Sequence, residues 1–240
     1  MIDLLLDIIF PQNSCCLCQK PGFHWSHRPW CPECEKSLQI QRQELVVCQK
    51  CGKYLNSGGS LCIDCEDEDP PFFIARSVGP YSGDFRKVTM MYKFLRRKGL
   101  AVKMARMMSE VIIATPEFGP LDLIVPVPSS ENSMSLRGFN QSALLATRIS
   151  GNLKVPANEI LVRVKETSSQ KELSRQERET NLKDAFVVKD GLETKIRGKE
   201  ILLVDDVYTT GSTTRECTRI LLEAEAKKVS VITWASGKGY

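Results

Sequence analysis

Eight cysteines near the start of the chain have the spacing of metal ligands. They form four Cys-x-x-Cys pairs, namely Cys15 with Cys18, Cys31 with Cys34, Cys48 with Cys51, and Cys62 with Cys65. One such turn directs two sulfurs at a single ion, and two turns complete the tetrahedral site that zinc prefers. The sequence therefore predicts two zinc ions, each held by four cysteines. We predict that the first pair joins the second and the third joins the fourth, although the spacing also allows interleaved pairing.

The simplest role of these metals is to stabilise a part of the chain that has too little hydrophobic core of its own. The alternative is direct contact of the zinc module with a nucleic acid or a protein partner. We expect Cys16 and Cys217 to be buried thiols. His24 and His27 are expected in loops rather than at the metals, because four sulfurs already complete each site.

Residues 201–213, with the sequence ILLVDDVYTTGST, contain a second set of residues suited to chemistry. An apolar strand is expected to end at two aspartates, after which the chain turns through small hydroxyl residues and Gly211 into a helix. Backbone N–H groups at such a turn wrap a phosphate with the help of the helix dipole, and Gly211 permits a close backbone approach. The expected phosphate-binding residues are Val207, Tyr208, Thr209, Thr210, Gly211, Ser212 and Thr213.

Asp205 and Asp206 are the predicted catalytic residues of this segment. At the end of a strand, their carboxylates can accept hydrogen bonds from the hydroxyl groups of a ribose. They can also stabilise positive charge that develops on a sugar carbon in an oxocarbenium-like transition state. The segment is therefore predicted to bind a sugar phosphate, with a strand-loop-helix turn that binds no ligand as the alternative.

Composition and charge restrict the classes of protein that fit this chain. It has 240 residues, of which 42% are hydrophobic and 26% charged, so it can bury a globular core. No apolar run approaches the roughly 18 residues that a membrane helix needs, and residues 1–10 carry acids where a secretion signal carries bases. We expect a soluble, cytoplasmic protein. The net charge is −4 over residues 1–70 and +8 over residues 71–240, so a polyanionic partner should prefer the second part.

Apolar strands alternate with helical stretches over the second part of the chain, which is typical of an α/β fold. The expected strands are 75–81, 123–127, 201–204 and 229–234, and the expected helices are 1–10, 83–115 with an interruption at Gly99, 138–150 and 213–226. Repeated strand-loop-helix units predict a mainly parallel sheet flanked by helices, with ligands at the carboxyl ends of its strands. An acidic run followed by two prolines, residues 66–71, cannot propagate either element. We therefore predict a zinc module at 1–69 and a second domain at 70–240.

The segment at 201–213 resembles the phosphoribosyl diphosphate (PRPP) motif of type I phosphoribosyltransferases. Further segments narrow the resemblance: residues 125–128, residues 137–141, and Gln170, Leu173, Arg178, Asn181, Ala185 and Phe186. Together they make the chain similar, over nearly its whole length, to the ComF family. The resemblance implies a type I phosphoribosyltransferase fold preceded by a double zinc ribbon.

The resemblance also implies a ligand and residues that bind it. PRPP is expected as its Mg²⁺ complex, because a diphosphate usually binds with that ion. By the resemblance, residues 127–130 form the loop that contacts pyrophosphate, with Pro128 and Ser129 as its candidate binding residues. Arg137 and Gln141 line the site beside this loop, together with Phe139 and Asn140. Arg175 and Arg178 belong to a hood at 170–181, where they could close on phosphates. A surface position for Arg137 and Arg178, and a core position for Phe139, are the alternatives.

The family resemblance implies a role in natural transformation. In that process single-stranded DNA is brought into the cytosol alongside a DNA-uptake helicase and recombination loader proteins. The inner face of the membrane is then an expected place of action, reached through the uptake machinery. Composition and spacing do not by themselves indicate these partners.

A basic stretch between residues 84 and 106 is a candidate nucleic-acid surface. Its candidate contact residues are Arg86, Lys87, Lys93, Arg96, Arg97 and Lys98. A solvated helix face is one alternative, and approach of Lys93, Arg96 and Arg97 to the diphosphate is another. Proteins that bind single strands combine such grooves with stacking aromatics, for which Tyr81, Tyr92 and Phe94 are candidates.

Three functions fit these observations. The first is a competence factor that binds single-stranded DNA and uses or senses PRPP. The second is a metabolic enzyme that transfers the phosphoribosyl group to a nucleobase or an amine, although we identify no base-reading residues. The third is a PRPP-sensing regulator without turnover.

Overall fold

The computed structural model describes residues 14–21, 29–43, 46–55, 58–165 and 182–239. The predicted helix at 1–10, the two histidines, and the hood residues Gln170, Leu173, Arg175, Arg178 and Asn181 lie outside these ranges. The chain separates into two compact units, Met1–Glu44 and Leu45–Tyr240. The predicted domain boundary between residues 69 and 70 therefore falls inside the second unit, so residues 45–69 group with the sheet by their contacts.

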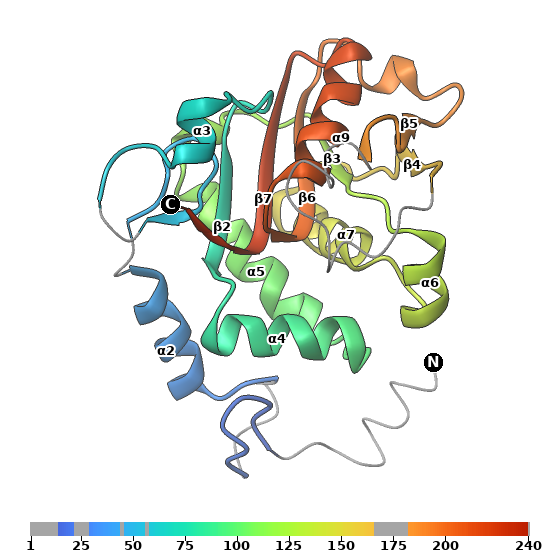
Figure 1. Ribbon diagram of the computed structural model, residues 1–240. Helices are drawn as coiled ribbons and strands as arrows, with labels where there is room; N and C mark the ends of the chain where they lie inside the picture. The colour runs from blue at the N-terminus through green and yellow to red at the C-terminus, as the bar shows by residue number, and fades with distance from the viewer. Residues whose placement is uncertain (1–13, 22–28, 44–45, 56–57, 166–181, 240) are drawn as a thin grey trace. The chain divides into compact units, whose positions relative to one another are not determined.

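A parallel sheet of four strands lies at the centre of the second unit (Figure 1). Its order is β2 (Ala75–Pro80), β7 (Lys228–Ser236), β6 (Glu200–Tyr208) and β3 (Leu123–Pro126). Every neighbouring pair in this order is parallel. The two inner strands are almost entirely buried, as expected for a sheet covered on both faces. The predicted mainly parallel sheet is thus confirmed.

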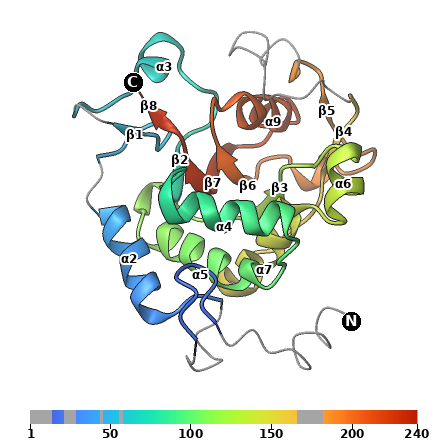
Figure 2. The ribbon, with the colours of Figure 1, turned by 60° about the horizontal axis from the view of Figure 1, so that its bottom comes forward.

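Helices cover both faces of this sheet (Figure 2). α4 (Gly83–Phe94), α5 (Leu100–Ile113) and α7 (Gln141–Leu153) lie on one face, and α9 (Ser212–Glu223) lies on the other. α4 ends and α5 begins on either side of Gly99, where an interruption was predicted.

Two sequence predictions need correction. The strand predicted at 201–204 extends as β6 to Tyr208, because β7 continues beside it and pairs Asp205 with Thr233 and Tyr208 with Ser236. The two aspartates therefore lie within the strand rather than after it. The helix predicted at 138–150 is α7, preceded by a separate helix α6 (Glu131–Arg137) that ends at Gly138 with φ of 76°.

The remaining elements are short and were not predicted, since two or three residues carry no periodic signal. They are β1 (Tyr54–Leu55) parallel to β8 (Lys238–Gly239), β4 (Leu161–Arg163) antiparallel to β5 (Phe186–Val188), α3 (Ile63–Asp67), and the 3-10 helices η2 (Pro116–Phe118) and η3 (Glu193–Lys195). In the first unit, α2 (Pro32–Gln43) begins within the second Cys-x-x-Cys turn, directly after Cys31, and carries Cys34.

Candidate phosphate site and metal centres

The eight paired cysteines form two groups whose sulfurs lie within 4.8 Å of one another. The first cysteine group contains Cys15, Cys18, Cys31 and Cys34, and the second cysteine group contains Cys48, Cys51, Cys62 and Cys65. Sulfur–sulfur distances are 3.7 Å for Cys15 and Cys34, 3.8 Å for Cys18 and Cys31, and 3.6 Å for Cys51 and Cys62. Four thiolates bound to one zinc stand about 3.8 Å apart, given tetrahedral geometry and Zn–S bonds of about 2.3 Å. Both groups fit zinc, and the sequential pairing of the turns is confirmed.

Backbone amides of the first two Cys-x-x-Cys turns favour a thiolate at Cys15. The N–H groups of Leu17, Cys18 and Cys31 donate to its Sγ over 3.4, 3.5 and 3.3 Å. Burial raises the pKa of Cys15, but these donors outweigh burial and lower it to about 7. Since thiolate is the form that binds zinc, the turn is prepared for a metal. In the second group, the Cys62 N–H donates to Cys48 Sγ over 3.4 Å.

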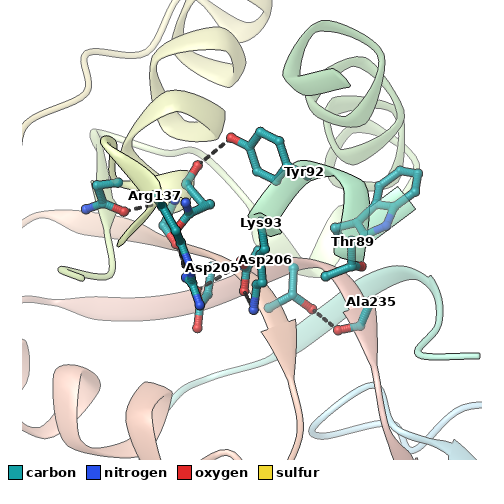
Figure 3. Close-up of polar contacts among 12 residues, drawn as sticks. Thr89, Tyr92, Lys93, Arg137, Asp205, Asp206 and Ala235 are labelled. Carbon is teal, nitrogen blue, oxygen red and sulfur yellow. Dashed lines mark hydrogen bonds and ion pairs between the residues drawn. The ribbon is translucent and has the colours of Figure 1, made fainter. Parts of the chain in front are cut away.

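Asp205 and Asp206, the acidic pair, lie near the carboxyl end of β6 and make contacts with two helices. Ser142 Oγ, at the start of α7, donates to Asp205 Oδ1 over 2.8 Å. Lys93 Nζ, near the end of α4, lies 2.8 Å from Asp206 Oδ1, as Figure 3 shows. Burial and the charge of Asp206 raise the pKa of Asp205 to about 7, against the opposing effects of Lys93 and Ser142. Ser142 and Lys93 thus hold the pair as an oriented acceptor site.

The turn after β6, Thr209–Thr213, is called the phosphate loop here. Gly211 has φ of +83°, a left-handed backbone that favours glycine, and α9 begins at the next residue. Thr210 Oγ1 and Ser212 Oγ lie 2.9 Å apart. An open hollow is lined by Asp205, Val207, Tyr208, Thr209, Thr210, Gly211, Ser212, Thr213 and Thr214. Hydroxyls and the N-terminus of α9 thus surround a small polar space beside the acidic pair.

Lys93 reaches the acidic pair because α4 is fixed from its buried face. Tyr92 is fully buried, and its hydroxyl donates to the Gln141 carbonyl over 2.8 Å. Lys93 is one of the nucleic-acid candidates, with approach to the diphosphate as the alternative, and the structure places it at Asp206. Burial also removes Tyr92 from the candidate stacking aromatics. Ser142 was missed, and its only sequence signal is its position after Asn140, which caps α7.

The segment between β3 and α7 carries the other predicted site residues. Arg137 Nη1 donates to Gln141 Oε1 over 2.9 Å, and Asn140 Nδ2 donates to the Val127 carbonyl over 3.2 Å. Gln141 is buried, and Pro128 and Ser129 are half-buried after β3. The structure therefore brings Arg137 and Gln141 together beside Ser142. Arg178 lies outside the described residues.

The basic candidates separate into two environments. The side chain of Lys93 is 19% exposed, whereas that of Lys87, which pairs with Asp84 at 2.8 Å, is 63% exposed. Arg86, Arg96 and Lys98 are exposed, and Arg97 is half-buried. Of the six basic candidates, all of which lie among the residues that the structure describes, Lys93 is the one that contacts the acidic pair.

Comparison with known proteins matches two domain families. Residues 5–66 match the double zinc ribbon domain, and residues 140–239 match the phosphoribosyl transferase domain. The chain is 35% identical over 221 residues to the DNA utilization protein YhgH of Salmonella typhi, covering 90% of this chain and 94% of that protein. It is 28% identical to Competence protein F of Haemophilus influenzae, covering 91% and 95%, and 29% identical to Competence protein ComFC of Bacillus subtilis, covering 78% and 76%. The chain belongs to the ComF family.

Membership of the ComF family accounts for both halves of the structure. The two cysteine groups are those of a double zinc ribbon, and the parallel sheet with its flanking helices is that of a type I phosphoribosyltransferase domain. In this ComF protein the second cysteine group belongs to the same compact unit as the sheet. Within the residues that the structure describes, no helix combines the length and the apolar character needed to cross a membrane.

Proposed function

We propose that this ComF protein binds PRPP as its magnesium complex and acts in natural transformation, in the uptake and cytosolic handling of single-stranded DNA. The observation that carries PRPP binding is the acidic pair within reach of Lys93 and Ser142, directly before a glycine turn into a helix. Two relatives are named competence proteins, which supports the cellular role. The expected place of action is the cytoplasm, at the inner face of the membrane where DNA enters.

Each part of PRPP has a suitable partner in the proposed site. The 5-phosphate binds the N–H groups and hydroxyls of the phosphate loop, while the ribose hydroxyls donate to Asp205 and Asp206. The carboxylates supply the oxygen ligands that Mg²⁺ prefers. The pyrophosphate of PRPP is proposed to contact Pro128, Ser129, Arg137 and Gln141, together with Arg178 of the hood. Bound Mg²⁺ would offset the negative charge of the diphosphate. The proposed arrangement serves binding and does not require that PRPP be turned over.

Lys93 is proposed as part of this site rather than of the nucleic-acid surface. Its ammonium pairs with the Asp206 carboxylate and adds positive charge to a pocket that must hold a polyanion. Asp206 is 6% exposed, so a carboxylate left without its partner there is costly. Lys93 is thus placed both to orient Asp206 and to attract the phosphate groups of PRPP.

Calorimetric titration with PRPP and Mg²⁺ tests the proposed site. We expect wild-type binding to be tighter for PRPP than for ribose 5-phosphate or pyrophosphate alone. Lys93→Met is expected to weaken PRPP binding about tenfold, or about 1.4 kcal/mol, because Asp206 loses its counter-charge. Lys87→Met on the same helix is the control and should bind normally. Absence of PRPP binding to the wild type contradicts the proposed ligand.

For single-stranded DNA, the exposed side of α4 is the proposed contact surface. Residues 86, 87, 90 and 94 are spaced along one helix face and are all exposed. Phe94 is 51% exposed, and the Arg137 guanidinium lies 5.4 Å from its ring centroid. An exposed aromatic ring among cations suits single-stranded DNA, because a base can stack on the ring while the cations neutralise the phosphates of the DNA backbone. Arg96, Arg97 and Lys98 extend the same surface, and the uptake helicase and recombination loader proteins are proposed partners through the family relationship.

Fluorescence anisotropy with a labelled oligothymidine tests this surface. Phe94→Ala is expected to weaken binding by about 1–3 kcal/mol, and Arg97→Glu is expected to reduce the salt dependence by about one unit of slope or more. Phe73→Ala is a matched control, since Phe73 is 53% exposed and has Lys228 Nζ 5.1 Å from its ring centroid. Equal effects of Phe94→Ala and Phe73→Ala, or unchanged affinity and salt slope in Arg97→Glu, would remove α4 as the DNA contact.

A further inference from the structure

The second cysteine group is packed into the core that carries the phosphate loop. Its four cysteines belong to one hydrophobic cluster with Phe72, Tyr208 and Cys217. All four are buried, and they lie in the same compact unit as the sheet. The first cysteine group belongs to the other compact unit. The two metal centres therefore have different structural surroundings, although their sequences repeat the same pattern.

Backbone contacts join the second cysteine group to the edge of the sheet. The Ala75 N–H donates to the Lys50 carbonyl over 2.8 Å, and Ser236 Oγ donates to the Gly52 carbonyl over 3.0 Å. A Cβ on Gly52, whose φ is +69°, would stand 2.7 Å from the Ala75 carbonyl oxygen. The turn that carries Cys48 and Cys51 is thus pressed directly against β2 and the end of β7.

Further contacts join the segment that carries the second cysteine group to the start of the phosphate loop. The Tyr54 N–H donates to the Gly237 carbonyl over 3.4 Å, and the Gly237 N–H donates to the Tyr208 carbonyl over 2.8 Å. The Tyr208 ring meets the Phe72 ring edge-on, with centroids 6.1 Å apart. Tyr208 also leaves no space at Gly211, where a Cβ would stand 2.2 Å from the Tyr208 hydroxyl. Tyr208 therefore links the second cysteine group to Gly211, which shapes the phosphate loop.

A second contact runs to the helix that follows the loop. Arg215, in the first turn of α9, lies with Nη1 3.5 Å from Glu68 Oε2, and Glu68 follows α3, which carries Cys65. Both ends of the phosphate loop, at Tyr208 and at α9, thus contact residues that follow the second cysteine group closely in the chain, namely Phe72 and Glu68.

We propose that the second metal centre is a positioning element of the phosphate site: through Phe72 and Tyr208 it holds the phosphate loop in the conformation that binds PRPP, whereas the first metal centre does not. This inference rests on the proposed PRPP binding. The metal does not touch the ligand, and its effect passes through Tyr208 and Gly211. The parallel sheet has its own buried core, so it can remain folded when the second metal is lost, while the phosphate loop loses its support.

The test compares the two metal centres in the full chain. Cys62→Ser/Cys65→Ser and Cys31→Ser/Cys34→Ser are each expected to lose one zinc, as measured by metal analysis. The first double variant should bind PRPP roughly tenfold or more weakly, within the range of coupled sites, and hydrogen exchange at residues 209–213 should become faster. The second should keep wild-type affinity and exchange there. Equal effects of the two variants, or unchanged affinity and exchange in Cys62→Ser/Cys65→Ser, would overturn the proposal.

Phe72→Leu keeps all metal ligands and covers the case in which the cysteine variant does not fold. It removes the ring contact with Tyr208, so it should retain both zinc ions while PRPP binding weakens and exchange at residues 209–213 accelerates. Unchanged exchange at the loop in this variant contradicts the proposed link. If the wild type binds no PRPP, the exchange measurement still reports on the link, so failure of the proposed ligand and failure of this inference are distinguishable.

Discussion

Replacing Asp205 and Asp206 together by asparagine is expected to abolish measurable PRPP binding. Asparagine keeps the shape of each side chain and removes the charge that, in the proposed site, binds Mg²⁺ and strengthens the hydrogen bonds from the ribose hydroxyls. Hydrogen bonds to charged groups contribute about 1.5–3 kcal/mol each, so the loss of two corresponds to a hundredfold or greater weakening, on the order of 3 kcal/mol or more. Calorimetry with PRPP and Mg²⁺ measures it, and Asp190→Asn, at an exposed residue after β5, is the control.

The same experiment has a pH dependence with a defined sign. Because burial and the charge of Asp206 raise the pKa of Asp205 to about 7, its carboxyl is largely protonated below that pH and ionised above it. The ionised form is the acceptor, so PRPP affinity of the wild type should rise between pH 6 and pH 8. Phosphate groups titrate in the same range, near pH 6, and Asp205→Asn separates the two effects because it should retain only the contribution of the ligand. A double variant that binds PRPP within threefold of the wild type contradicts the site.

Gly211→Ala is expected to reduce PRPP binding by about a hundredfold, since the loop loses charge-assisted contacts to phosphate. The backbone there has φ of +83°, and the added Cβ would stand 2.2 Å from the Tyr208 hydroxyl and 2.5 Å from its Cζ. Tyr208 cannot readily move aside, because it is 3% exposed and packs against Phe72. The loop must therefore change its conformation. Calorimetry measures the affinity, and thermal unfolding is expected to show a lowered Tm.

Gly191→Ala is the matched control for this prediction. Gly191 has φ of +77° in the turn after β5, and nothing lies within 4 Å of its added Cβ. It shares the backbone strain, which costs about 1–2 kcal/mol, without the clash and away from the phosphate loop. We expect lowered stability with unchanged PRPP affinity. Wild-type affinity in Gly211→Ala, or equal loss of affinity in the two variants, would show that the geometry of the phosphate loop does not govern binding.

Sequence alone predicted the parts of the site that are local in the chain. Each Cys-x-x-Cys turn contains both of its sulfurs, and the segment at 201–213 contains the strand, the acidic pair, the glycine turn and the start of the helix. Such arrangements follow from backbone geometry over a few residues. The parallel sheet also followed from short-range patterns, because buried strands and intervening helices carry their own hydrophobic periodicity.

Only the tertiary structure decided which distant side chains complete the site. Lys93 and Ser142 reach the acidic pair from two helices that lie far apart in the sequence. Pairing with β7 extends β6 past the aspartates. Contacts with β2 and Tyr208 join the second cysteine group to the sheet. These outcomes depend on how elements pack against one another, and packing between distant elements leaves no periodic signal in the local sequence.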